Sequence, residues 1–253
     1  MSAADIVVAA RDASYSIAGY RSFEFATFEA RIGRTCALLS SEPACARDLL
    51  LAIAGFLRPV SGSLKVAGAE LSSARALRGK RPRRAAVPPR GTVGIGIFAS
   101  VADVPTHLTV EEVVTREMRL RAPRGAEGRA AGADTLDYLA SFNIATQSSR
   151  RVSQLGPRDR ARLSTALACV GSPQVAVVDL GDPFIGALSH DDALALAGEM
   201  GAAARTFGLA LVFSSSDPAV ACAADRSFAL DIDASEALRT FEAVMEDSEV
   251  SAS

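Results

Sequence analysis

Short runs of consecutive apolar residues, separated by longer stretches of helical character, constrain the fold of this chain more than any other feature. A strand with one face in water alternates apolar and polar residues, whereas a strand covered on both faces is apolar throughout. These runs are therefore expected to form buried strands. Strands that alternate with helices predict a layered α/β fold with a mostly parallel sheet. The expected strands are Ile6–Ala10, Thr35–Leu39, Val93–Phe98, Val175–Asp179, Ala210–Ser214 and Arg226–Asp231.

Three stretches between these strands are expected to be helices. Arg47–Phe56 follows the second strand after a short turn. In Arg158–Val170, apolar residues recur at i, i+3, i+4 and i+7, which places them on one buried face. Asp191–Phe207 is preceded by Ser189, a residue type that often caps the start of a helix.

Composition excludes several classes of protein. The chain has 253 residues, of which 49% are apolar and 22% charged, and its formal net charge is −2. A chain of this size and balance buries a sizeable core, and as a whole it is not expected to bind nucleic acid. It has no run of ~18 uncharged apolar residues and no visible secretory signal in Met1–Arg11. Its four cysteines form no C-x-x-C pair, which favours a reducing cytoplasm.

Two charged segments depart from the α/β pattern. Leu71–Gly91 contains seven basic residues, and no acidic residue occurs between Leu71 and Ala102. We expect a solvated loop, with a contact to an anionic surface through Arg75–Arg90 as the alternative. The tail after Ile232 is acidic, and its last residues, from Ser248 onward, are expected to fray.

The segment 35–68, TCALLSSEPACARDLLLAIAGFLRPVSGSLKVAG, resembles the start of an ATP-binding cassette (ABC) transporter nucleotide-binding subunit. Its AIAG, LRP and SGSL match the family's pattern after the phosphate loop. The likeness continues with HLTVEEV at 107–113, the signature-helix region at 151–173, VAVVDLGDPF at 175–184 and LVFSSSDPAVACAADR at 211–226. These matches occur in the family's order and cover about residues 6–231. The resemblance implies a P-loop NTPase-like ABC cassette.

That resemblance also implies a division of the chain. Residues 1–253 are expected to form one nucleotide-binding-domain-like unit with a mostly parallel core at 1–100 and 152–231. The core is expected to include an N-terminal antiparallel β part. Residues 101–151 correspond to the inserted helical subdomain, which faces the permease in this family. Residues 232–253 are the acidic C-terminal tail.

The phosphate-loop chemistry is not retained. In G-x-x-x-x-G-K-[ST], the glycines allow backbone N–H groups to face phosphate, the lysine pairs with phosphates, and the hydroxyl holds Mg²⁺. Ser40 and Cys45 stand at the glycine positions, Ala46 at the lysine position and Arg47 at the hydroxyl position. Pro43 has no N–H to donate. The positional matches to a nucleotide-binding loop are Ser40, Ser41, Glu42, Pro43, Ala44, Cys45, Ala46 and Arg47.

The other positions that the family uses for hydrolysis are altered as well. Asp179 stands where the family holds Mg²⁺, and it is the candidate metal ligand, although a residue at a strand end also serves in turns. Leu180, which cannot take up a proton, stands at the general-base position. The signature reads LGPRD at 155–159, and Ser216 replaces the switch histidine. The metal-sensing glutamine would fall near 99–100, where the sequence has none.

We therefore interpret the chain as a pseudo-ATPase scaffold or regulatory subunit of a membrane transport complex, with no catalytic residue of its own. Its expected partners are a membrane permease, a second intact cassette, or both, at the cytoplasmic face of the membrane. ATP and Mg²⁺ would be its cofactors only if nucleotide binding survives. One alternative is a transport ATPase subunit active only beside a competent cassette. Another is a non-transport interaction protein that uses the basic loop 75–90.

Overall fold

The computed structural model describes residues 5–17, 19–71, 87–121 and 131–251. Most of the expected basic contact, residues 75–86, lies outside the described residues. Within the described part of the chain, no helix is both long and apolar enough to span a bilayer.

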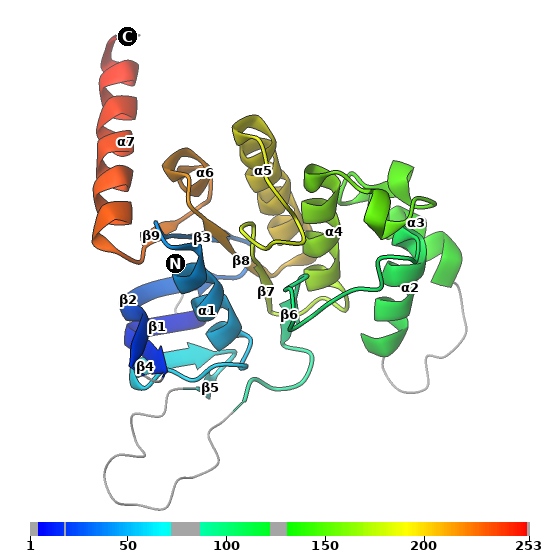
Figure 1. Cartoon of the computed structure of the whole chain (residues 1–253), viewed down its shortest axis with the longest axis horizontal. Coiled ribbons are helices and arrows are strands. Elements are labelled where there is room, and N and C mark those ends of the chain that lie inside the picture. The colour runs from blue at the N-terminus through cyan, green and yellow to red at the C-terminus, as the bar shows by residue number, and fades with distance from the viewer. Residues whose placement is uncertain (1–4, 18, 72–86, 122–130, 252–253) are drawn as a thin grey trace, which may run out of the picture.

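A five-stranded parallel sheet forms the centre of the molecule (Figure 1), with strand order β6-β7-β8-β3-β9. The strands are β3 (Thr35–Leu39), β6 (Val93–Ile95), β7 (Val175–Val178), β8 (Ala210–Ser215) and β9 (Ser227–Ala229). All five overlap expected strands, so the parallel α/β core is confirmed. β6 and β9 are shorter than expected, and β7 ends one residue earlier. Asp179 therefore lies just beyond the carboxyl end of β7.

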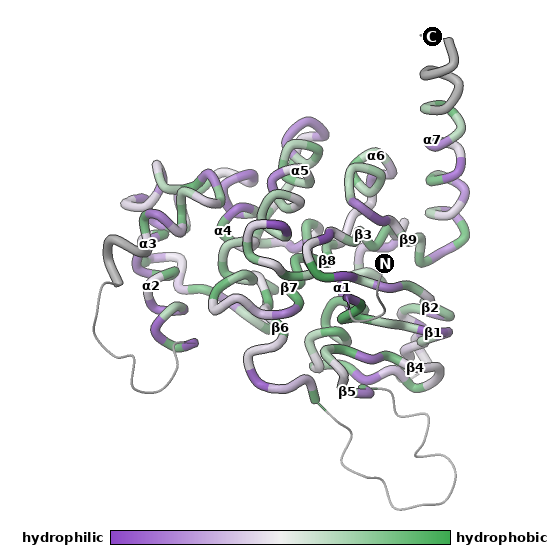
Figure 2. Tube along the Cα trace, turned by 180° about the vertical axis from the view of Figure 1, so that it is seen from behind, coloured by the Kyte–Doolittle hydropathy of each residue, from purple (hydrophilic) through white to green (hydrophobic). Residues whose placement is uncertain are grey.

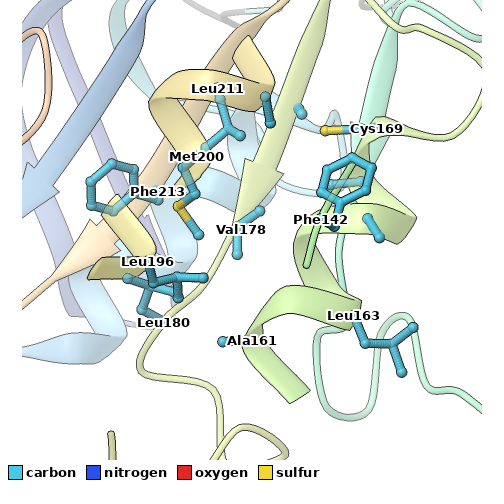
Figure 3. Close-up of a cluster of buried hydrophobic side chains, with 14 of the residues drawn as sticks. Phe142, Ala161, Leu163, Cys169, Val178, Leu180, Leu196, Met200, Leu211 and Phe213 are labelled. Atoms are coloured by element: carbon cyan, nitrogen blue, oxygen red, sulfur yellow. The ribbon is translucent and has the colours of Figure 1, made fainter. Parts of the chain in front are cut away.

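The parallel sheet is covered on both faces, which explains why its strands are apolar without alternation. Along β8, Leu211 and Phe213 belong to the apolar cluster on one face, whereas Ala210 and Val212 belong to the cluster on the other. Figure 3 shows Leu211 and Phe213 packed with Met200 and Val178. The hydropathy of the chain trace changes accordingly, with apolar segments at the sheet and polar segments on outer helices and loops (Figure 2).

The N-terminal part adds a second, antiparallel sheet with strand order β2-β1-β4-β5. Its strands are β1 (Ile6–Ile17), β2 (Tyr20–Arg31), β4 (Ser61–Val66) and β5 (Ala69–Glu70). This sheet confirms the antiparallel β part that the resemblance implied. β1 is longer than the expected Ile6–Ala10, because it pairs with both β2 and β4 along its length.

Helix α1 (Pro43–Ile53) packs against β2 of the antiparallel sheet and against β8 of the parallel sheet. The expected helix Arg47–Phe56 was wrong at both ends. The helix starts at Pro43 because the fixed φ of proline suits the first helical position, where its missing N–H is not needed. Arg47 consequently lies within the helix and not in the preceding turn.

The remaining helices flank the parallel sheet. α4 (Pro157–Cys169) and α5 (His190–Phe207) contact it from the side opposite α1, and α6 (Pro218–Cys222) lies beside α5. Ser189 caps α5 by accepting a hydrogen bond from the Asp192 N–H, as its sequence position suggested. α2 (Val110–Arg121) and α3 (Ala131–Ala140) form a helical part next to α4 in Figure 1.

The acidic tail is a helix. α7 (Ile232–Ser251) extends away from the body in Figure 1, and the expectation that the chain frays from Ser248 is wrong as far as Ser251. Its first turn is held by Asp231, whose Oδ1 accepts a hydrogen bond from the Ala234 N–H at 2.7 Å. A side-chain acceptor at this position satisfies a backbone donor that the helix itself cannot pair.

Candidate functional site

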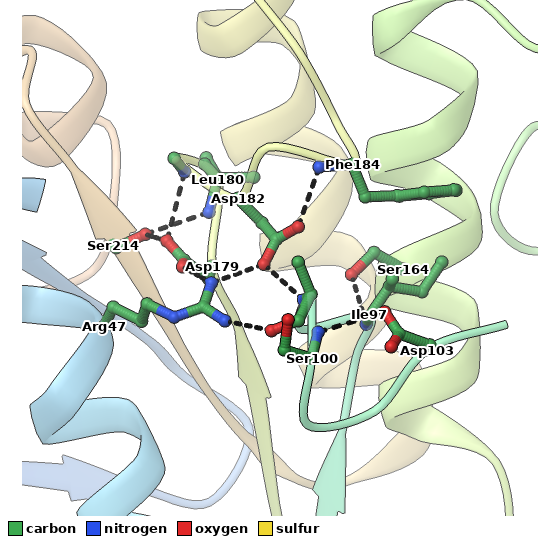
Figure 4. Close-up of polar contacts among 12 residues, drawn as sticks. Arg47, Ile97, Ser100, Asp103, Ser164, Asp179, Leu180, Asp182, Phe184 and Ser214 are labelled. Atoms are coloured by element: carbon green, nitrogen blue, oxygen red, sulfur yellow. Dashed lines mark hydrogen bonds and ion pairs between the residues drawn. The ribbon is translucent and has the colours of Figure 1, made fainter. Parts of the chain in front are cut away.

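The side chain of Arg47 lies at the carboxyl end of the parallel sheet, between three segments of the chain (Figure 4). Its Nη1 donates to Asp179 Oδ2 at 3.1 Å and to Asp182 Oδ2 at 2.5 Å. Its Nη2 donates to the Ala99 carbonyl at 2.7 Å. The guanidinium also lies 5.4 Å from the centre of the Phe98 ring, within the range of a cation–π contact. One cation thus connects α1, the turn after β7 and the segment after β6.

The two carboxylates that face Arg47 are buried and fully engaged. Asp179 Oδ1 accepts from Ser214 Oγ at 2.6 Å and from the Gly181 N–H at 3.1 Å. Asp182 accepts from two backbone N–H groups, of Phe184 through Oδ1 and of Ala99 through Oδ2, each at 2.8 Å. Burial raises the pKa of Asp179, and the hydrogen bond from Ser214 and the charge of Arg47 oppose that rise.

These residues do not fit a bound magnesium ion as they stand. Mg²⁺ requires oxygen ligands, usually one or two carboxylates with waters. The outer oxygens of Asp179 and Asp182 instead converge on the Arg47 guanidinium, which is a cation itself. Asp179 as a metal ligand therefore remains a prediction, and it would require Arg47 to leave this position.

The loop before α1 is also occupied from within the chain. Ser40 Oγ donates to Asp231 Oδ2 at 2.8 Å, and the Ser41 N–H donates to the same oxygen at 2.9 Å. The Glu42 N–H donates back to Ser40 Oγ at 3.1 Å. The Asp231 carboxylate, just before α7, thus accepts the hydrogen bond of a loop N–H group. A bound phosphate would need that N–H group as a donor. Burial by itself would raise the pKa of Asp231. The hydrogen bonds from the Ala234 N–H and from the Ser40 and Ser41 donors outweigh burial and hold this pKa below its usual range.

The loop therefore does not fit a triphosphate. Ala46 stands at the lysine position and is 1% exposed, so it supplies neither charge nor reach. Glu42 precedes the helix and places a second acidic side chain beside the loop. Cys45 is buried, and burial followed by the neighbouring Glu42 raises the pKa of its thiol to about 11. The eight loop positions stay a positional match to a nucleotide-binding loop.

A cavity of about 280 Å³ lies beside this site, between the start of α1 and the segment after β8. Leu180 lines it at the position of the general base, and its backbone N–H donates to Ser214 Oγ. Ser216, at the switch position, also lines it. His190 also lines the cavity, its side chain is 54% exposed, and its Nδ1 lies 2.5 Å from Asp217 Oδ2.

At the start of α4, the residues of the signature segment pair within the chain. Arg158 contacts Asp192 and Glu199 of α5 at 3.2 and 3.1 Å. Arg162 contacts Glu199 at 2.6 Å and Asp159 at 3.2 Å. Burial by itself would raise the pKa of Glu199. The hydrogen bonds from both arginines outweigh burial and hold this pKa below its usual range. The signature positions Arg158 and Asp159 are thus engaged with other side chains of α4 and α5.

The structure brings Arg47 and Asp179, both candidate site residues, into contact, and it places Ala99, at the glutamine position, beside them. Sequence reasoning missed three features: the guanidinium between two carboxylates, the Asp231 contact, and the ion pairs of Glu199. The sequence did contain a signal for the guanidinium between two carboxylates. Arg47 stands at the position of the hydroxyl that holds the metal in the family, and Asp179 and Asp182 follow a buried strand.

The fold is similar to that of several solved structures. A parallel sheet with a loop and helix after β3, an antiparallel sheet on one side and a helical part on the other make up the fold seen in solved ABC transporter cassettes. Among solved structures, cbiO1 of Clostridium perfringens, part of the ABC transporter complex cbiONQ, is 15% identical, with a TM-score of 0.67 over 90% of this chain and 85% of that one. The dimeric ABC transporter cassette MJ0796, described as bacterial, is 14% identical, with a TM-score of 0.65 over 88% of this chain and 94% of that one.

One curated relative is similar to the chain in sequence over part of its length. The sulfate/thiosulfate import ATP-binding protein CysA of Mycolicibacterium paratuberculosis is 27% identical over 180 residues, 71% of this chain. The chain spans 44% of the length of that relative. No protein-family model matches the chain.

Proposed function

We propose that this chain is a pseudo-ATPase, an ABC-type cassette that acts as a scaffold or regulatory subunit of a membrane transport complex. The observation that carries the proposal is the place of the Arg47 guanidinium, in contact with Asp179, Asp182 and the Ala99 carbonyl. A metal-bound triphosphate would need these oxygens as acceptors or ligands.

Two other features support the loss of hydrolysis. Leu180 stands at the general-base position and has no group that can accept a proton from water. Deleting a general base costs roughly 10²–10⁴ in rate by itself. The loop also lacks a phosphate-binding lysine, and charge-assisted hydrogen bonds of this kind contribute roughly 1.5–3 kcal/mol each. Several losses of this size together would weaken a micromolar site, of about −8 kcal/mol, to beyond millimolar.

The proposed partners are a membrane permease and a second, intact cassette at the cytoplasmic face of the membrane. The helical part supports this proposal, because it carries exposed apolar side chains: Leu120 is 69% exposed and Leu136 is 42% exposed. In the family that the sequence resembles, this segment faces the permease. The relatives also support it, since their printed names are those of import and transporter components.

Nucleotide binding is tested by thermal unfolding with and without millimolar Mg-ATP. A ligand at 100 times its Kd stabilises the folded protein by ~2.7 kcal/mol, which raises Tm by roughly 5–10 °C for a chain of this size. We expect no shift and no phosphate release by the isolated chain. A clear shift would favour the alternative of a transport ATPase subunit that works beside a competent cassette, and turnover by the chain alone would overturn the proposal.

Association is tested in cells of the protein's own source by co-purification with membranes. Leu120→Asp and Leu136→Asp are expected to release the chain from a multi-span permease identified in the complex. Val244→Asp is the matched control, because Val244 is also exposed, at 57%, but lies on α7. Recovery with unrelated, non-membrane proteins alone, or equal binding by all three variants, would contradict the proposed role.

A further inference from the structure

We propose that the Arg47 guanidinium is a built-in cation that replaces a divalent metal and joins three segments of the site without any ligand. The proposal goes beyond the function proposed above, because it assigns Arg47 a structural role that depends on neither nucleotide nor a partner protein. It rests on the contacts of the described residues in Figure 4.

The geometry is that of a single bridging ion. One nitrogen, Nη1, donates to one carboxylate oxygen of each of Asp179 and Asp182, and Nη2 donates to the Ala99 carbonyl. These partners are 132, 135 and 52 residues from Arg47 in sequence. The side chains of Asp179 and Asp182 are 3% and 0% exposed, so water does not compensate their charge.

Two buried carboxylates that converge on one point repel each other unless a cation lies between them. A metal ion would meet this need only at sufficient concentration, whereas arginine remains charged at every pH at which proteins fold. The link between α1, the turn after β7 and the segment after β6 is therefore permanent. Asp182 also accepts hydrogen bonds from the backbone N–H groups of Ala99 and Phe184. These two hydrogen bonds persist only while Arg47 holds the Asp182 carboxylate in place.

A double-mutant cycle tests the role of the cation. Arg47→Met leaves both carboxylates without a counter-ion, and we expect Tm to fall by roughly 10 °C. Adding Asp182→Asn removes one of the two stranded charges, so the double variant is expected to be more stable than Arg47→Met alone. Arg21→Met is the matched control, because Arg21 forms an ion pair with Glu24 but its side chain is 74% exposed, and its Tm should stay near that of the wild type.

The replacement of a metal is tested with Mn²⁺ as the probe. Arg47→Ser clears the guanidinium and leaves the two carboxylates, the Ala99 carbonyl and a new hydroxyl, which are ligands of the kind that Mn²⁺ prefers. We expect millimolar Mn²⁺ to raise Tm of Arg47→Ser and to give a bound signal by electron paramagnetic resonance, with neither effect in the wild type. The Arg47→Ser, Asp182→Asn variant is expected to lose both effects.

Additive effects in the cycle, or no Mn²⁺ effect in Arg47→Ser, would overturn the inference, whereas the proposed scaffold function is decided separately by the thermal unfolding with Mg-ATP and by the co-purification. Where the Met or Ser variant does not fold, Arg47→Lys tests the same contacts, because an ammonium cannot reach both carboxylates and the carbonyl in the planar arrangement of a guanidinium. Faster amide hydrogen exchange at Ala99 and Phe184 in Arg47→Lys would support the inference, and unchanged exchange would overturn it.

Discussion

The carboxylate of Asp231 and the hydroxyl of Ser40 are hydrogen-bonded at 2.8 Å although 191 residues separate them in the chain. They meet because Ser40 follows β3 and Asp231 follows β9, and these two strands are neighbours in the parallel sheet. The same carboxylate caps α7 through the Ala234 N–H. One acidic side chain thus holds both the loop before α1 and the first turn of the C-terminal helix.

Replacing Asp231 by alanine should loosen both segments. The variant loses the cap of α7 and leaves the Ser41 N–H without its acceptor, which we expect to cost roughly 1–2 kcal/mol of unfolding free energy. Urea denaturation followed by circular dichroism measures the loss. Asp233→Ala serves as control, because Asp233 is exposed in the same first turn. Equal stabilities of the two variants would show that the contacts of Asp231 contribute nothing measurable.

The ion pairs of Glu199 predict a dependence of stability on pH. Its pKa in the folded chain lies below the unfolded value, so its stabilising contribution is fully present above about pH 4.3 and is lost as pH falls through the lowered pKa. Glu199→Gln is expected to be less stable by roughly 1 kcal/mol at pH 7 and to approach the wild type as pH falls below the lowered pKa of Glu199. Denaturation curves at a series of pH values test this, with the exposed Glu236→Gln as control. A constant difference at every pH would contradict the ion-pair explanation.

Restoring the general base alone should not restore hydrolysis. Leu180→Glu places a carboxylate at the position next to Asp179, at the edge of the cavity beside the loop. Arg47 still occupies the carboxylates of Asp179 and Asp182, and the loop still lacks a lysine. We expect phosphate release from Mg-ATP to stay at the level of the buffer. Turnover by this variant would mean that the site binds Mg-ATP despite Arg47.

Two glycines offer a matched test of packing. A Cβ at Gly94 in β6 would lie 1.8 Å from the Ala168 carbonyl oxygen of α4, so Gly94→Ala should lower the unfolding free energy by about 3 kcal/mol or more. A Cβ at Gly198 in α5 meets no atom of the described chain within 4 Å. Gly198→Ala should therefore stabilise the protein by about 0.5–1 kcal/mol. Thermal unfolding of the two variants measures both changes in stability. An unchanged Tm for Gly94→Ala would show that β6 and α4 can move apart without loss of unfolding free energy.

The layered fold was predictable because burial is encoded locally. Residues 175–178 and 210–213 are apolar without alternation, and each strand indeed has both faces covered. The cap at Ser189 followed from residue type and position, since such a cap involves a neighbour only three residues away. The start of α1 was misplaced because Pro43 was read as a feature of the loop and not as a first helical residue.

The sequence by itself determined that the chain forms a layered α/β fold with a parallel sheet, and it led to the prediction that the glycines, lysine and general base of a nucleotide site are replaced. Only the tertiary structure decided what Arg47, Asp179 and Asp231 do. The physical reason is that burial depends on the local pattern of apolar residues, whereas the partner of a charged side chain depends on which strand ends lie side by side. Strand order brings β3, β7, β8 and β9 together, and no local pattern in the chain records that order.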